Sequence, residues 1–167
     1  MNMLINIAEL AGAPGRELPF SFTVPAAELD VDGADYDFVG SIEAAGTVVN
    51  TGTAFRIAGQ VAATKHFVCN RCLKECTEAQ EHALAETFQR GGSEESDIVV
   101  LEGGMVDLTA LVRDTLLAAQ PLSNICKPDC KGLCPVCGHD LNEGDCGCDR
   151  FVPDPRLAAL QQLKLDD

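Results

Sequence analysis

The sequence predicts an α+β protein: an antiparallel β-sheet or partial barrel with a packed helix, followed by a cysteine-rich segment and a C-terminal helix. Three observations lead to this class. Long extended runs rich in Val, Ile, Thr and Phe are separated by turn residues, one later stretch has helical spacing of its apolar residues, and six of the nine cysteines lie between Cys126 and Cys148. We expect a β-rich core domain over residues 1–122, and a second segment over residues 123–167 that docks on that core.

Extended runs fill most of the first ninety residues. Asn50-Thr51-Gly52 joins two of them and is typical of a hairpin turn, and Pro19 places an earlier strand at a sheet edge or at its own start. Residues 75–89 are rich in glutamate, which favours a helix, but they return from a Cys-x-x-Cys turn, which favours a strand; we expect a strand. The expected strands are residues 3–7, 18–24, 38–49, 54–68, 75–89 and 98–101.

A helix is expected at residues 107–119, where apolar side chains recur at the i, i+3, i+4, i+7 spacing of one helical face. Asp107 is expected to be its N-cap, Pro121 ends it, and we interpret its apolar stripe as core packing. Another helix is expected to start at Asp154-Pro155, because a capping residue followed by proline in the first turn is a common helix start.

The Cys134-Pro135-Val136-Cys137-Gly138 sequence has the spacing of a zinc knuckle. Two thiolates separated by two residues can both reach one ion at about 2.3 Å. Gly138 follows where the chain often needs a positive φ, which glycine adopts at no steric cost. Further on, Cys146 and Cys148 are spaced i and i+2, so in an extended segment both side chains would lie on one face and could meet the same metal.

A second Cys-x-x-Cys pair, Cys69 and Cys72, lies far upstream, with 53 residues between Cys72 and Cys126. A metal bound there would tie the middle of the chain to its C-terminal third. Cys76 is expected to be an ordinary small residue. The sequence therefore predicts one or two structural zinc ions, with ligands drawn from Cys69, Cys72, Cys126, Cys130, Cys134, Cys137, Cys146 and Cys148.

Three partitions of these ligands are open. The first places Cys69 and Cys72 with Cys126 and Cys130, and leaves the other four cysteines as a local site. The second pairs the two knuckles with each other, as in a zinc ribbon, and the third leaves Cys69 and Cys72 free. Disulfides are disfavoured by the odd number of cysteines and by an N-terminus without a secretory signal, which also indicates a cytoplasmic protein. A thioredoxin-like redox pair competes for Cys69 and Cys72.

The net charge of −14 argues against broad binding to a phosphate backbone and favours basic partners. No apolar run approaches the ~18–20 residues that span a membrane. No acidic residue lies between Glu43 and Glu75, so a small basic face is expected near the first knuckle; the alternative is that these bases only offset the thiolates. The candidate partner-binding residues are Lys65, Arg71, Lys74 and Lys131.

Features of common enzymes are absent from the sequence. The three histidines have no H-x-x-x-H spacing, whereas a catalytic zinc keeps an open position and usually has histidine or carboxylate ligands. There is no phosphate loop, dinucleotide fingerprint or nucleophile elbow. We therefore predict no catalytic residues and a protein that is not an enzyme.

Taken together, several of these stretches resemble the YceD-type proteins of bacteria and plastids, which are named as large-ribosomal-RNA-subunit accumulation proteins. The resemblance spans about residues 1–165. It rests on the Cys69–Leu73 turn after a long hairpin, the helix around Asp107–Ala119, the run Cys130–Gly138 with Asp140-Leu141-Asn142 following, Cys146-Gly147-Cys148, and the tail Asp154–Leu157.

The resemblance implies a role in accumulation or processing of large-subunit ribosomal RNA, hence in ribosome assembly. The implied partners are that RNA or basic ribosomal and assembly proteins. The acidic charge fits better if the protein holds a basic protein, or if it contacts RNA only through the basic residues between Glu43 and Glu75. Another class of function stays open: a thiol-based redox sensor or zinc-dependent chaperone that releases its metal on oxidation. Zinc content before and after mild peroxide separates the two.

Overall fold

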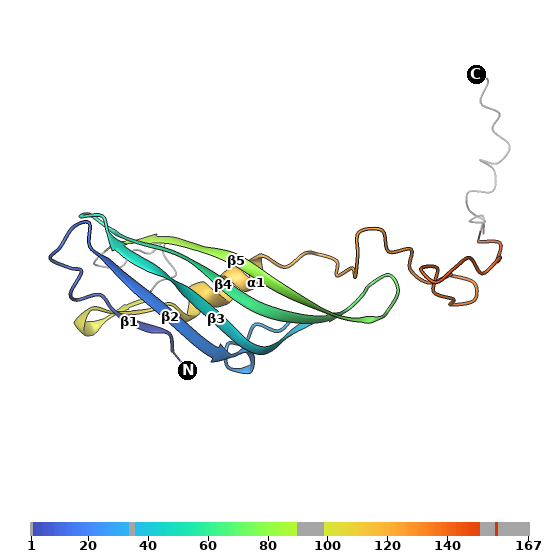
Figure 1. The fold of residues 1–167 in the computed structure, drawn as a ribbon, viewed down its shortest axis with the longest axis horizontal. Coiled ribbons are helices and arrows are strands. Elements are labelled where there is room, and N and C mark those ends of the chain that lie inside the picture. Colours follow the sequence, from blue (N-terminus) through green and yellow to red (C-terminus); the bar gives the residue numbers. More distant parts are fainter. Residues whose placement is uncertain (1, 34–35, 90–98, 151–155, 157–167) are drawn as a thin grey trace, which may run out of the picture. The chain divides into compact units, whose positions relative to one another are not determined.

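The structure is a computed structural model in which residues 2–33, 36–89, 99–150 and 156 are described (Figure 1). The chain divides into two compact units. We call Met1–Val68 with Glu75–Asn124 the sheet unit, and Cys69–Lys74 with Ile125–Asp167 the cysteine unit. The chain thus enters the cysteine unit twice, first for six residues and then to its end. The docking of this segment on the core stays a prediction, and the helix expected from Asp154 lies outside the described residues.

The sheet unit is built on a four-stranded antiparallel sheet in the order β2-β3-β4-β5 (Figure 1). The strand expected at residues 75–89 is confirmed by β5. At the predicted hairpin, the Thr51 amide donates to the Ala54 carbonyl over 2.9 Å, and Gly52 has a φ of 97°. The strands are β2 (Glu17–Pro25), β3 (Tyr36–Asn50), β4 (Phe55–Val68) and β5 (Glu75–Phe88).

A bulge interrupts the pairing of β3 with β4. The register shifts between Val39 and Glu43, because Val39 lies opposite Thr64 while Glu43 lies opposite Ala62. Three residues of β3 therefore face one residue of β4, and Gly40 begins the irregularity at a φ of 76°, which an L side chain rarely adopts. This bulge was not predicted from the sequence.

A smaller antiparallel sheet has the order β1-β7-β6, with β1 (Leu4–Asn6), β6 (Val99–Leu101) and β7 (Met105–Asp107). The helix α1 (Thr109–Ala118) follows, and the short 3₁₀ helices are η1 (Ala26–Glu28) and η2 (Glu102–Gly104). The expectation that Asp107 is the N-cap was wrong: it ends β7, and Leu108 is the N-cap of α1. The Asp107 carboxylate still accepts the Thr109 amide over 2.9 Å, so it satisfies a free donor of the first turn.

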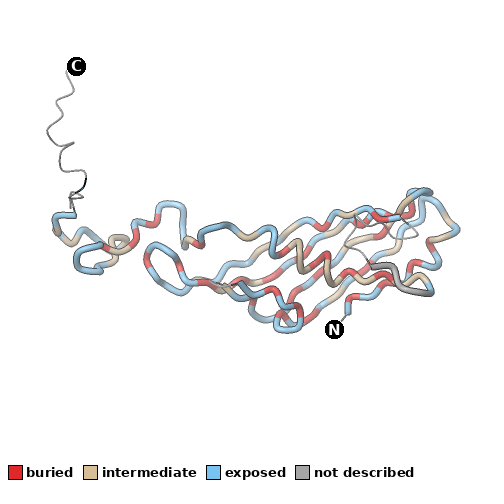
Figure 2. The backbone as a smooth tube through the Cα atoms, turned by 180° about the vertical axis from the view of Figure 1, so that it is seen from behind, coloured by how far each residue is buried: buried red, intermediate tan, exposed pale blue. Residues whose placement is uncertain are grey.

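The apolar core lies on one face of the four-stranded sheet. Buried and exposed residues alternate along the long strands (Figure 2), as expected when a sheet buries one face only. Side chains from β1, β7 and α1, including Ile5, Val106 and Leu116, belong to the same buried cluster as Ile42 and Ile57 of the sheet. No described residue of the cysteine unit belongs to this cluster.

The cysteine unit contains turns and one isolated β-bridge, between Leu133 and Asp140, in its described part. The buried side chains of the unit are Cys69, Cys72, Cys130 and Cys134. Over the described part of the chain, none of the helices has the length and apolar character that crossing a bilayer would require.

Candidate metal centre

The two Cys-x-x-Cys turns have the same backbone hydrogen bonds. The Leu73 amide donates to the Cys69 carbonyl over 2.9 Å, and the Gly138 amide donates to the Cys134 carbonyl over 2.8 Å. The first cysteine of each turn then donates its own amide to a carbonyl five residues on, at 2.9 Å for Cys69 and 2.8 Å for Cys134. Both turns are therefore knuckles of one type, although only one of them has the glycine that this geometry favours.

The residue after each knuckle has a left-handed backbone. Gly138 has a φ of 74°, as its sequence position predicts, whereas Leu73 has a φ of 57° in the equivalent place. A left-handed conformation brings a Cβ too close to the following carbonyl and costs roughly 1–2 kcal/mol for an ordinary L residue. The first knuckle therefore holds a strained leucine where the second has an unstrained glycine.

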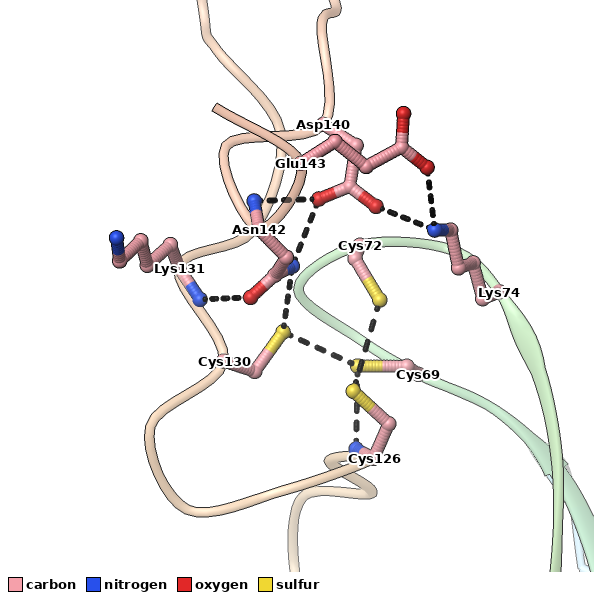
Figure 3. A network of polar contacts seen from close by, with 9 residues as sticks. All are labelled: Cys69, Cys72, Lys74, Cys126, Cys130, Lys131, Asp140, Asn142 and Glu143. Atoms are coloured by element: carbon pink, nitrogen blue, oxygen red, sulfur yellow. Dashed lines mark hydrogen bonds and ion pairs between the residues drawn. The ribbon is translucent and has the colours of Figure 1, made fainter. Parts of the chain in front are cut away.

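The first group joins the upstream knuckle to the start of the cysteine-rich segment (Figure 3). The Sγ atoms of Cys69 and Cys130 are 3.9 Å apart, those of Cys72 and Cys126 are 3.7 Å apart, and all four lie within 4.8 Å of one another. Ligands of one tetrahedral zinc should be about 3.8 Å apart when each Zn–S bond is near 2.3 Å. The four sulfurs thus fit a tetrahedral ion, and their grouping is that of the first partition.

The second group is local, and it consists of Cys134, Cys137, Cys146 and Cys148, whose sulfurs also lie within 4.8 Å of one another. Cys134 is buried, Cys137 is exposed, and the other two are intermediate. The extended geometry expected for the last two was wrong, because Gly147 has a φ of 69° and bends the chain between them. The bend still lets both sulfurs reach the group. Cys76 belongs to neither group.

Asn142 supports the first group and was not predicted as a site residue. Its side-chain amide donates to Cys130 Sγ over 3.5 Å, and its Oδ1 accepts the Lys131 amide over 2.9 Å (Figure 3). Asp140 Oδ1 in turn accepts the Asn142 backbone amide over 2.8 Å. A donor held in this way orients the sulfur and stabilises it as a thiolate. The only hint in the sequence was the Asp-Leu-Asn run next to the second knuckle.

Lys74 joins the two segments of the cysteine unit. Its ammonium lies 2.7 Å from Asp140 Oδ2 and 2.9 Å from Glu143 Oε1. The hydrogen bond from Lys74, with that from the Asn142 amide, lowers the pKa of Asp140 to about 2. The same contacts, first with Asp140 and then with Glu143, raise the pKa of Lys74. Lys74 therefore has internal partners in the cysteine unit.

Arg71 also ties the knuckle to the downstream segment. Its guanidinium donates to the Cys130 carbonyl over 2.9 Å, and its own carbonyl accepts the Leu133 amide over 3.1 Å. Gly132 makes this approach possible, because a Cβ at that position would lie 2.9 Å from the Arg71 carbonyl oxygen. The first group is thus held by backbone packing as well as by its sulfurs.

Each group contains one thiol whose pKa is lowered and another whose pKa is raised. Burial opposes ionisation of Cys69, but hydrogen bonds from the amides of Cys72, Cys126 and Arg71 outweigh it and lower its pKa to about 6. Amides of the second knuckle lower the pKa of Cys134 to about 6 in the same way. Burial and the neighbouring thiols raise the pKa of Cys126 to about 12. A divalent cation would offset the repulsion that keeps thiolates from accumulating in such a group.

Lys65 is a correction to the predicted partner-binding residues, because it is buried, with 1% of its surface exposed. Its ammonium donates to Asn124 Oδ1 over 2.6 Å and lies 4.7 Å from the ring centre of Tyr36 and 5.2 Å from that of Phe67. Burial lowers its pKa. The period-two alternation of β4 could have revealed this, since Lys65 shares the inward face with Phe67. Of the other three, Arg71, Lys74 and Lys131 are exposed, and their partner role stays a prediction.

The fold and the two groups define a β-sheet protein with two four-cysteine groups that could hold metal ions. The chain belongs to the family described as Large ribosomal RNA subunit accumulation protein YceD, which it matches over residues 57–164, so the resemblance seen in the sequence is confirmed. This range includes all eight cysteines of the two groups.

Three relatives illustrate the extent of the similarity. Protein Rv2926c of Mycobacterium tuberculosis is 29% identical over 168 residues, which cover 96% of this chain and 81% of the relative. Protein YlbN of Bacillus subtilis is 27% identical over 173 residues, covering 96% of each chain. The chloroplastic YCED homolog 1 of Arabidopsis thaliana is 32% identical over 59 residues, covering 35% of this chain and 18% of the relative. No solved structure matches the chain.

Proposed function

We propose that this protein is a non-enzymatic ribosome-biogenesis factor that supports the accumulation or processing of large-subunit ribosomal RNA. The observation that carries this proposal is the family match over residues 57–164, because the family is named for accumulation of that RNA. The Arabidopsis relative has the same name, and the part it shares with this chain supports the same role. The cytoplasm, where ribosomes are assembled, is the proposed location.

The two cysteine groups are proposed to be structural zinc sites. Four sulfur ligands at tetrahedral separations suit zinc, and a site with four protein ligands has no open position for a water or a substrate. In the part of the chain that the structure describes, no other group of three or more metal-binding side chains comes together. A structural role for the metal supports the proposal that the protein is not an enzyme.

Charge supports a basic protein as the direct partner. The sheet unit has eighteen of the twenty-six acidic residues and only five of the twelve lysines and arginines. Such a surface repels a phosphate backbone and attracts the lysine- and arginine-rich segments of a basic protein. Large-subunit ribosomal RNA could then be reached through a bound ribosomal or assembly protein, or through the exposed Arg71 and Lys131 of the cysteine unit.

Complementation of a deletion strain tests this function. The intact gene should restore the ratio of large- to small-subunit ribosomal RNA, whereas a Cys69→Ser/Cys72→Ser variant should fail. Cys76→Ser is the matched control, because Cys76 lies outside both groups, and it should restore the ratio. Sedimentation of the tagged protein with ribosomal precursors, with and without nuclease, tells RNA from protein contact. An unchanged ratio in the deletion strain would contradict the proposal.

The redox alternative is favoured by one observation, the exposure of Cys137 in the second group. An exposed thiolate is open to peroxide, and its oxidation would release the metal. Zinc content measured before and after mild peroxide decides between the two. Stable zinc with unchanged association with ribosomal precursors supports the assembly factor, and reversible zinc loss that alters the association supports the redox sensor.

A further inference from the structure

The outer face of the four-stranded sheet is unusual in composition. The buried cluster lies on the opposite face, and no residue that we describe from the smaller sheet or α1 covers the outer one. Where β3, β4 and β5 pair, about half of the outward positions are alanine or threonine, and the outward positions are exposed or half-exposed. A face of small side chains leaves room for another molecule's side chains to approach the backbone.

In one row across this face, one glutamate lies on each side of an alanine. The register pairs Thr23 with Glu43, Glu43 with Ala62, and Ala62 with Glu81, so all four side chains point to the same side. Adjacent strands lie about 4.8 Å apart, which places the two glutamates roughly 10 Å from each other with only a methyl group between them. Both side chains are exposed, and neither carboxylate has an ion-pair or hydrogen-bond partner among the described residues.

The β3 bulge adds a groove next to this row. The groove has a volume of about 430 Å³ and exists because three residues of β3 face one residue of β4, which opens the strands. Its lining combines apolar side chains, among them Val39, Ala62 and Ala79, with polar ones, among them Glu43 and Thr64. A groove that places apolar side chains beside a carboxylate suits a side chain with an aliphatic stem and a cationic head.

We propose that this groove binds a lysine or arginine side chain from an extended, basic segment of a protein partner. The stem lies along Val39 and Ala79, and the ammonium or guanidinium group lies above Ala62 between Glu43 and Glu81. The inference deepens the proposed function, on which it rests, by naming the surface that a basic ribosomal or assembly protein would use. RNA and a second copy of this acidic chain are both repelled by the same carboxylates.

A resident cation in the groove gives the sharpest test. Ala62→Lys places an ammonium between the two glutamates, while Ala58→Lys adds the same charge four residues away on the same face, between Thr47 and Ala85. The probe is a twelve-residue peptide of alternating lysine and serine, titrated into the zinc-loaded full chain at about 0.1 M salt and followed by calorimetry. We expect Ala62→Lys to weaken binding about tenfold, or roughly 1.4 kcal/mol, and Ala58→Lys to weaken it less than threefold.

A second pair of variants removes charge instead of adding it. Glu43→Gln/Glu81→Gln should weaken peptide binding about as much as Ala62→Lys. The matched control Glu17→Gln/Glu75→Gln changes two exposed glutamates outside this row and should change binding little. Equal losses in site and control variants would overturn the proposal. So would binding of a short RNA, or self-association of the chain, that depends on the same glutamates. Ribosomal RNA levels do not enter this measurement, so a failed complementation test would leave its result intact.

Discussion

The two units of this protein are stabilised by different means. The sheet unit buries a continuous apolar cluster that runs from Met3 to Leu116. The cysteine unit buries no described hydrocarbon side chain, and its buried side chains are four cysteines. Its segments are joined by knuckle hydrogen bonds, by Asn142 and by the Lys74 ion pairs. Burial of apolar surface provides most of the stability in the first case, whereas the second unit would depend on the metal ions that we propose its cysteines hold.

The same contrast appears in the charge. The cysteine unit has seven basic and eight acidic residues, close to balance, while the sheet unit has a large acidic excess. Eight thiolates and two zinc ions would add a formal charge of −4 to the cysteine unit. Arg71 and Lys74 contact groups within the cysteine unit, and the sheet unit has the larger acidic excess.

Removal of the metal should have the largest effect, because it should destabilise the cysteine unit and leave the sheet unit folded. Structural zinc in small domains contributes about 10–16 kcal/mol to folding at neutral pH. A strong chelator should therefore expose the amides of residues 126–148 to hydrogen exchange and leave those of β3 and β4 protected. The control is the same chelator saturated with zinc. If exchange in residues 126–148 is indifferent to chelation, these groups do not hold a structural metal.

Lys65→Glu should destabilise the sheet unit and leave the cysteine unit folded. It replaces a buried ammonium with a carboxylate that faces the rings of Tyr36 and Phe67 and lies across the strand pair from Glu78. An uncompensated buried charge costs about 3–5 kcal/mol, so urea should unfold the sheet unit at a much lower concentration while bound zinc is retained. Lys131→Glu, an exposed change of the same charge, is the control. A fully stable Lys65→Glu protein would show that Lys65 is accessible after all.

Much of the sheet unit could be predicted from the sequence. Strands β3, β4 and β5 are long, and β-branched residues with turn signals set the hairpin between the first two, so local pattern sufficed. The pairing of β1 with β7 joins residues about a hundred positions apart, and no local pattern encodes such a contact. The bulge after Val39 was missed for a similar reason, because it is defined by the partner strand.

In the cysteine unit, the grouping of the cysteines could be predicted from the sequence, but the residues that support the groups could not. The spacing of cysteines limits which sulfurs can meet, and loop entropy favours local grouping of the last four, so the first partition could be written from the sequence. The contact of Asn142 with Cys130 depends on how a turn folds back, which spacing does not define. For Lys65, a feature that the sequence contains was overlooked. Its charge led us to expect an exposed position, although the alternation of inward and outward residues in β4 places it in the core.

Asn142→Ala should weaken metal binding in the first group and leave it unchanged in the second. The loss of its hydrogen bonds to Cys130 Sγ and to the Lys131 amide leaves the first group without its oriented donor. Changes of this kind typically weaken metal binding by about tenfold or more. Competition with a graded chelator should show one zinc ion bound more weakly and the second unchanged, so the second group is an internal control. Equal weakening of both would mean that Asn142 supports the fold of the whole unit.

The smallest expected effect compares the two knuckles directly. Leu73 is 63% exposed and has a φ of 57°, so its replacement loses little packing and relieves strain. The left-handed conformation costs leucine about 1–2 kcal/mol, and glycine in exchange costs roughly 0.5–1 kcal/mol more unfolded-state entropy. Leu73→Gly should therefore strengthen zinc binding in the first group by about 0.5 kcal/mol, or roughly twofold.

Gly138→Ala makes the reverse change at the equivalent place. It forces a Cβ into a φ of 74° with no other atom within 4 Å of that Cβ, so backbone strain alone should weaken the second group, by about 1 kcal/mol or roughly fivefold. Zinc competition at matched protein concentration measures both variants. If Leu73→Gly weakens the first group instead, the leucine makes a contact that offsets its strain.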